Sequence, residues 1–192
     1  TATSAAGKTA QYKLTVKTPS VKLNASAKTL YVKGSPATVT LKATTAGVTG
    51  KVTYTSSKPS VAAVAANGKV TAKAAGTAVI TAKCGNYKAT CKITVKKPAV
   101  KASASAKTVF VGGTSQIKVE KTGVSGKVTY TSSNKSVAVV SAGGKVTAKK
   151  AGTAVITATS SNGKSASCTV TVKQKDTYTG LRDVNGTLTY FN

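Results

Sequence analysis

A segment that occurs twice sets the strongest limit on how this chain can fold. Residues 68–82 and residues 144–158 have the same sequence, except that Ala74 becomes Lys150. Self-similarity at a fixed period predicts one structural unit that has been copied along the chain. The 192 residues are therefore expected to form two domains of about eighty residues each.

Each copy contains two runs, 69–72 and 77–82 in the first, in which apolar residues occupy every second position. A period of two is typical of half-buried strands, and Ala75-Gly76 between the runs predicts a turn. We expect the two runs to be strands of an antiparallel sheet joined by that turn. Because β-branched residues abound and no long helical periodicity exists, the predicted fold class is all-β. About seven short strands per repeat predict two tandem β-sandwich domains.

The repeats also predict the domain divisions. The first domain is expected at residues 19–97 and the second at 98–173, and the short join between them predicts an end-to-end array. Residues 1–17 align without gaps on residues 157–173. We therefore interpret residues 1–18 as the last hairpin of a preceding, truncated repeat. Since the first residue is not Met, we expect a mature or excised fragment of a longer array.

The chain is strongly basic, with 29 Lys plus Arg, 3 Asp plus Glu and a formal net charge of +26. Such a field attracts polyanions within about 8 Å at physiological salt. Lysines that form the outward half of alternating strands would equally keep the surface soluble and the sheet edges unpaired. The candidate polyanion contacts are Lys51 and Lys127, which hold matching positions. Arginine and aromatic side chains are too scarce to predict specific nucleic-acid binding.

The three cysteines leave two alternatives open. If the turn after Cys84 centres on Tyr87-Lys88, Cys84 and Cys91 lie opposite one another and form a candidate disulfide. If Gly85-Asn86 is a two-residue turn, the register shifts and no bond forms. Cys168 takes the position of Cys91 in the second repeat and is expected to be a small buried apolar residue.

The residue types needed for catalysis are scarce. Histidine is absent, and the three carboxylates, Glu120, Asp176 and Asp183, are scattered. We therefore predict no enzyme activity, no metal site and no cofactor. Tyr54 and Tyr130 hold matching positions and are expected to anchor the core, with a stacking platform for sugars or bases as the alternative. The sequence has no apolar run long enough to span a bilayer and no signal peptide, so membrane insertion is not expected.

A family resemblance is carried by motifs that recur in both repeats. In the first repeat they are residues 52–57, 61–64, 68–72 and 76–78, and in the second they are residues 132–138 and 144–153. These motifs resemble the bacterial immunoglobulin-like group 2 domain over nearly all of residues 19–173. Tyr54 and Tyr130 stand where that family usually has Trp. The calcium binding described for some members is not carried over, because it would need acidic clusters.

The last segment, residues 174–192, differs in composition, and Asn185-Gly186 predicts a two-residue hairpin. This segment is similar to the start of a cell-wall-binding repeat of the choline- and glucan-binding type. The aromatic residues that carry the similarity are Tyr178, Tyr190 and Phe191. Leu181 and Leu188 stand where those repeats normally have Trp. The alternative interpretation is an ordinary closing hairpin.

The resemblance implies an extracellular stalk or adhesin module of a bacterial surface protein, as in intimin-like and clostridial surface proteins. The predicted function is non-catalytic: to space or present a binding or anchoring domain. One alternative is a basic binding module for anionic cell-wall polymers or acidic glycans, and another is an accessory part of a surface enzyme. The predicted partner is an anionic wall polymer or a host surface glycan or protein, and the chain is expected to be monomeric within its array.

Overall fold

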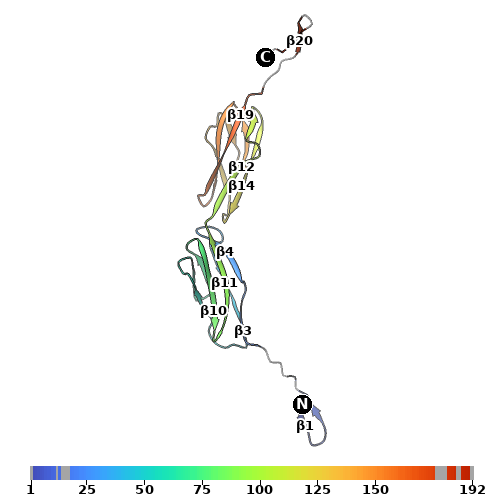
Figure 1. Cartoon of the computed structure of the whole chain (residues 1–192), viewed down its shortest axis with the longest axis vertical. Coiled ribbons are helices and arrows are strands. Elements are labelled where there is room, and N and C mark those ends of the chain that lie inside the picture. Colours follow the sequence, from blue (N-terminus) through green and yellow to red (C-terminus); the bar gives the residue numbers. More distant parts are fainter. Residues whose placement is uncertain (1, 12, 14–17, 176–180, 185–186, 191–192) are drawn as a thin grey trace. The chain divides into compact units, whose positions relative to one another are not determined.

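The computed structural model describes residues 2–11, 13, 18–175, 181–184 and 187–190. Every regular element within these residues is a strand (Figure 1). The chain divides into two compact units, one of residues 1–32 and 36–96 and the other of residues 33–35 and 97–192. The predictions of an all-β fold and of tandem β-sandwich domains are confirmed. Below, the strands β3 to β11 are called the first domain and the strands β12 to β19 the second domain.

The first domain has nine strands in two layers. They are β3 (Ser20–Leu23), β4 (Ala27–Tyr31), β5 (Thr38–Thr40), β6 (Ala43–Ala46), β7 (Thr53–Ser56), β8 (Ala62–Val64), β9 (Lys69–Ala72), β10 (Gly76–Cys84) and β11 (Tyr87–Lys96). One layer is the four-stranded sheet β4-β11-β10-β7. The other layer consists of the pair β3-β6 and the three-stranded sheet β5-β9-β8.

The second domain repeats this plan with eight strands. They are β12 (Ala99–Ala104), β13 (Thr108–Phe110), β14 (Thr114–Thr122), β15 (Val128–Ser132), β16 (Ala138–Val140), β17 (Lys145–Ala148), β18 (Gly152–Ser160) and β19 (Ser165–Lys173). Two four-stranded sheets, β13-β19-β18-β15 and β12-β14-β17-β16, form its layers. Strand β14 spans the positions that β5 and β6 hold in the first domain.

The break between β5 and β6 has a local cause. The backbone N–H of Lys42 donates to the side-chain Oδ1 of Asn24 at 3.0 Å, and the N–H of Ala43 donates to the hydroxyl of Tyr54 at 3.1 Å. Two consecutive N–H groups are therefore bonded to side chains rather than to a neighbouring strand. The ladder is interrupted at this point, while no buried donor is left unpaired.

The inward positions of the alternating strands form the core of each domain. In the first domain Leu30, Leu41, Ile80 and Ile93 are essentially inaccessible to solvent. In the second domain Ile156, Val146 and Val170 are buried to the same degree. The outward residues of the same strands are mostly Thr, Ser and Lys. This inward and outward alternation is what the period of two predicts.

The expectation that both runs of the duplicated segment belong to one antiparallel sheet is wrong. Both predicted runs are strands, β9 and β10, but β9 pairs with β5 and β8 whereas β10 pairs with β11 and β7. The segment around Ala75-Gly76 therefore leads the chain from one layer to the other instead of closing a hairpin. Alternation alone specifies which face of a strand is buried, and it does not specify the neighbouring strand.

Two further hairpins lie outside the domains. Strands β1 (Ala2–Thr3) and β2 (Thr9–Ala10) pair in the register that β18 and β19 use 156 residues later: Ala2 is opposite Ala10, as Ala158 is opposite Ala166. The turn hydrogen bonds recur as well, from Ser4 N–H to the Lys8 carbonyl and from Gly7 N–H to the Ser4 carbonyl, each 2.9 Å. At the other end β20 (Leu181–Val184) pairs with β21 (Thr187–Tyr190), which confirms the predicted hairpin. Its turn residues, 185–186, lie outside the described residues.

Candidate functional site

The register of β10 and β11 decides between the two alternatives for the cysteines. Cys84 lies opposite Tyr87, so that Gly85-Asn86 forms a two-residue turn, with Gly85 at a φ of 55° in its first position. Cys91 lies opposite Ile80 instead. The candidate Cys84–Cys91 disulfide is therefore corrected: the two side chains are four positions apart in register, and both thiols are free.

The cysteines are poor candidates for nucleophilic chemistry. Burial raises the pKa of the Cys91 thiol, and the nearby Lys28 ammonium offsets part of this rise. Burial also raises the pKa of the Cys168 thiol. A thiol reacts through its thiolate, so a raised pKa lowers its reactivity at neutral pH. Cys91 packs in the core, as a small apolar residue does, and Cys168 is half-buried against the corresponding core.

Tyr54 acts as a core anchor, as predicted. Its ring packs against the cores of the first domain, and its hydroxyl accepts the hydrogen bond from Ala43. Tyr130 holds the matching place in the second domain and packs against that core. Each ring also lies against a glycine, Gly68 or Gly144, whose φ is close to 80°. Both rings are half-buried, so neither presents a full aromatic face to a ligand.

A hollow of about 690 Å³ lies beside Tyr130. The residues that line it are Lys127, Val128, Thr129, Tyr130, Ala142 and Gly143. A second, smaller hollow is lined by Tyr130, Thr131, Ser132, Lys135, Val139 and Val140. Each hollow has one lysine and no carboxylate, histidine or cysteine, so neither combines the groups that general acid–base or metal-assisted catalysis requires.

The other predicted site residues are placed as follows. Lys51 and Lys127 are exposed; Lys127 directly precedes β15, and Lys51 lies two residues before β7. They hold matching positions in the two domains, and the ammonium of Lys121 donates to the carbonyl of Gly126, next to Lys127, at 3.0 Å. Tyr190 ends β21, whereas Tyr178 and Phe191 lie outside the described residues, so the wall-binding hypothesis for this hairpin stays a prediction. Among the described residues no group of three His, Cys, Asp or Glu could hold a metal ion.

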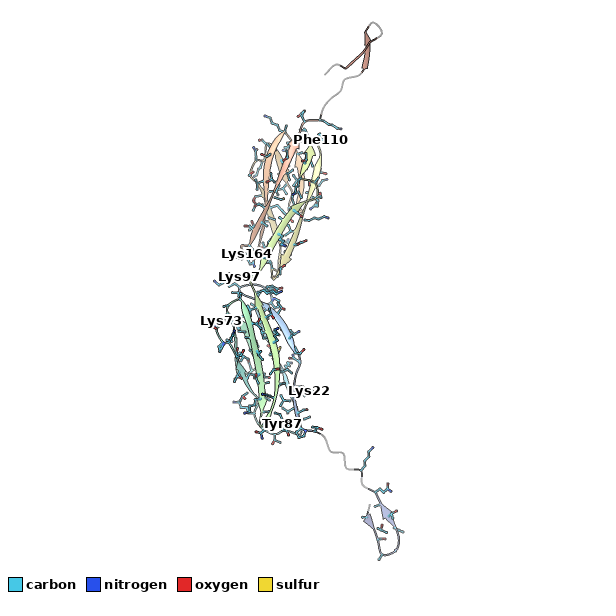
Figure 2. The ribbon with its side chains drawn as sticks, in the orientation of Figure 1. Lys22, Lys73, Tyr87, Lys97, Phe110 and Lys164 are labelled. Atoms are coloured by element: carbon cyan, nitrogen blue, oxygen red, sulfur yellow. The ribbon has the colours of Figure 1, made fainter. Side chains whose placement is uncertain are left out.

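The layer formed by β3-β6 and β5-β9-β8 in the first domain, and by β12-β14-β17-β16 in the second, carries lysines at positions that the two domains share. Figure 2 labels Lys22 and Lys73 among the side chains that extend from the first domain, and Lys164 on the second. Lys42 and Lys69 have counterparts in Lys118 and Lys145 at the same spacing in the sequence. These positions are exposed in both domains, as a solubility role predicts.

The four-stranded sheet of the first domain carries a lysine group that the sequence reasoning did not single out. Its outer face presents Lys83 from β10 and Lys88, Lys92 and Lys96 from β11, all exposed. We call these four residues the lysine face. A spacing of four residues along a strand places side chains on one side of a sheet. That spacing was visible in the sequence, but the pairing of Lys83 with Lys88 depends on the turn register.

Comparison with protein families gives matches for both domains. Residues 50–97 match the model described as a bacterial Ig-like domain. Residues 95–170 match the model described as a bacterial Ig-like domain of group 2. The chain belongs to the bacterial immunoglobulin-like domains. The group 2 model matches only the second Ig-like domain, and the first matches the more general model over its second half.

Solved structures similar to these Ig-like domains include proteins of bacterial surfaces. The S-layer protein rSbsC is 23% identical with a TM-score of 0.50, over 86% of this chain and 29% of that one. A fragment holding SbsC domains 4 and 5 is 25% identical with a TM-score of 0.49, over 81% and 98%. A C-terminal intimin fragment, in complex with the intimin-binding domain of its translocated receptor, is 18% identical with a TM-score of 0.37, over 81% and 64%.

The likeness to rSbsC supports the Ig-like fold and nothing more specific. The chain spans about a third of the length of the SbsC structure with domains 1–6. The comparison with curated proteins gives no match. In the described part of the chain no helix is long and apolar enough to cross a membrane.

Proposed function

We propose that the two Ig-like domains form a non-catalytic spacer in the extracellular part of a bacterial surface protein, where they hold a binding or anchoring domain away from the cell. The observation that carries the proposal is the join between the domains. Strand β11 ends at Lys96 and β12 begins at Ala99, so only Lys97 and Pro98 separate the two sandwiches along the chain. A proline in so short a join fixes one backbone dihedral and restricts the residue before it.

The chemistry of the described residues agrees with a structural role. The hollows beside Tyr130 lack the acid, base and nucleophile that an enzyme site needs. Burial raises the pKa of the Cys91 and Cys168 thiols. The bacterial Ig-like family assignment favours a surface protein. A role as an accessory part of a surface enzyme stays a prediction, because the catalytic domain would lie in a different part of such a protein.

Small-angle X-ray scattering of the full chain tests the spacer directly. We expect an elongated particle whose maximum dimension is well above that of one domain, with a narrow distribution of domain separations. The matched variant carries a Gly-Ser-Gly-Ser insertion between Lys97 and Pro98, which leaves both sandwiches intact and should broaden that distribution. A compact particle, or identical scattering from the two proteins, would contradict the proposal.

A further inference from the structure

The lysine face differs from the other lysines of the chain because the second domain keeps only one of its four positions. Lys96 at the end of β11 corresponds to Lys173 at the end of β19, whereas the other three lysines have no counterpart. The positions of Lys83, Lys88 and Lys92 correspond to Thr159, Ser165 and Thr169, which pair in the same hairpin of the second domain. Lysines on the other layer, such as Lys42 and Lys69, are instead kept as Lys118 and Lys145. The net charges of the two domains are similar, +13 for residues 19–97 (13 Lys, no Asp or Glu) and +10 for residues 98–173 (11 Lys, one Glu), so the domains differ in where the lysines are placed. A requirement for solubility therefore does not explain why only one domain carries this group.

The lysine face also has a built-in repulsion. Lys83 and Lys88 are direct cross-strand partners, and like charges in that position destabilise a sheet. The sequence contains no Asp or Glu before Glu120, so the first domain has no carboxylate of its own to neutralise this pair. The counter-charge has to come from outside the domain.

The geometry of the face fits a linear ligand. Lys88, Lys92 and Lys96 follow one another along β11 at intervals of about 14 Å, and together they span about 27 Å. Thr90 and Thr94 point to the same side between them, and Thr81 lies opposite Thr90 on β10. The hydroxyl groups can donate hydrogen bonds to anionic oxygens that lie between the lysines. A polymer with a negative charge in each repeating unit, lying along β11, would contact every lysine of the row.

The side-chain types on the face indicate which polyanion fits. All the cations are lysines, whose ammonium groups bind anionic oxygens as point charges, and the face carries no arginine for bidentate recognition of carboxylate or phosphate groups. Tyr31, opposite Lys96, is the single aromatic side chain that the register places on this face, at its end. Single-stranded nucleic acid is bound through successive aromatic platforms, which this sheet does not provide.

We propose that the lysine face of the first domain binds a linear phosphodiester polymer of the poly(glycerol phosphate) type, and that the corresponding face of the second domain does not. The choice of a cell-wall polymer rests on the proposed surface location. The binding itself is a property of the isolated chain and does not depend on the spacer role.

The test uses the full chain and three variants with poly(glycerol phosphate) of defined length as the probe. The first variant carries Lys83→Thr, Lys88→Ser and Lys92→Thr, the residue types of the second domain. The control carries Lys22→Thr, Lys42→Thr and Lys69→Thr on the other layer, so both lower the net charge of +26 by the same three units. The third variant carries Thr159→Lys, Ser165→Lys and Thr169→Lys, which transfers the group to the second domain.

Affinity is measured by isothermal titration calorimetry over a series of salt concentrations, and circular dichroism checks that each variant is folded. The first variant should lose at least about tenfold in affinity at low salt and show a shallower dependence on salt, whereas the control should change less than about threefold. The third variant should bind more tightly than the natural chain. Equal losses in the first variant and the control would overturn the inference, because the binding would then follow net charge alone.

Two further probes identify the class of polymer. Poly(L-glutamate) of similar length carries carboxylates, and oligodeoxythymidylate carries phosphodiesters together with bases. Tighter binding of either one than of poly(glycerol phosphate) would overturn the assignment to a wall-type phosphodiester polymer. None of these outcomes depends on particle shape, so the spacer proposal can fail in the scattering experiment while the lysine face is confirmed, or the reverse.

Discussion

The two domains have matching buried residues, and they differ in the side chains on the outer face of one sheet. The inward residues Ile80 and Ile156 are equally inaccessible to solvent. Side-chain hydrogen bonds recur at the same positions, such as those from the hydroxyls of Ser56 and Ser132 to the carbonyls of Ala62 and Ala138, at 2.6 and 2.7 Å. The outer face of the β10–β11 hairpin carries four lysines, whereas the β18–β19 hairpin keeps only Lys173 and has Thr or Ser at the other three positions. In a two-layered sandwich the inward half of each strand specifies the fold, and the outward half is free to diverge.

The largest expected effect tests whether the interiors are equivalent. Ile80→Ala and Ile156→Ala should each destabilise their own domain by about 2–5 kcal/mol, because each removes a fully buried side chain and leaves a cavity. Native-state hydrogen exchange of the full chain, read from β10–β11 and β18–β19 peptides, assigns the loss to a domain. If the two substitutions lowered the free energy of unfolding by clearly different amounts, the two cores would not be equivalent.

A smaller effect should distinguish the two domains at a matched glycine. An added Cβ at Gly68 would collide with the backbone carbonyl oxygen of Leu41, whereas at Gly144 its nearest contacts are the Tyr130 ring at 3.0 Å and the Gln116 side chain at 3.1 Å. Both positions have positive φ, which costs roughly 1–2 kcal/mol for a non-glycine residue. Gly68→Ala should therefore destabilise its domain more than Gly144→Ala, because a backbone atom yields less readily than a side chain. Equal losses by hydrogen exchange would show that the segment carrying Leu41, between β5 and β6, can shift.

The thiols give a further contrast that depends on pH. Burial raises the pKa of Cys91 and Cys168 above the ordinary value of 9.0. Above that value an unfolded thiol ionises first, so the unfolded chain binds fewer protons and the stability linked to each thiol falls as pH rises toward the folded-state pKa. At pH 9 iodoacetamide should therefore label both thiols more slowly in the native than in the unfolded chain, with the fully buried Cys91 slower than the half-buried Cys168. Mass spectrometry of the two peptides measures the rates, and equal native rates would remove the contrast.

The smallest expected effect concerns the repulsion across the lysine face. Lys83→Thr with Lys88→Ser should stabilise the first domain by roughly 0.2–1 kcal/mol, the range for cross-strand pairs, and the gain should shrink as salt is added. Denaturation at low and high salt measures the gain, with Lys42→Thr and Lys69→Thr as the control pair. A gain that salt leaves unchanged would assign the effect to strand propensity rather than to charge.

The sequence predicts the strands of this fold better than their partners. The alternation around Ile80 predicts a strand with one buried face, because burial follows from the period of two. It does not predict that β9 and β10 lie in different layers, since the turn at Ala75-Gly76 is compatible with either arrangement. The choice between a bonded and a free Cys84 depended on the register of one hairpin, which the packing of Cys84 and Cys91 in separate clusters resolves.

The lysine face was harder to predict than the strands, because it depends on which strands are paired and in which register. Lys51 and Lys127 stood out in the sequence because they match between the repeats. The lysine face is distinguished by the opposite property, a mismatch between the repeats. It becomes visible as a surface only when the pairing of Lys83 with Lys88 is known, and a single sequence does not supply that pairing.

The pairing of β4 with β11, and of β13 with β19, is parallel in both domains. An early strand and the last strand of each sandwich are therefore joined side by side and run in the same direction. If tension is applied to the two ends of such a domain, these strands are drawn along their length in opposite directions. Their backbone hydrogen bonds are then loaded together in shear instead of breaking one after another, an arrangement that resists mechanical extension.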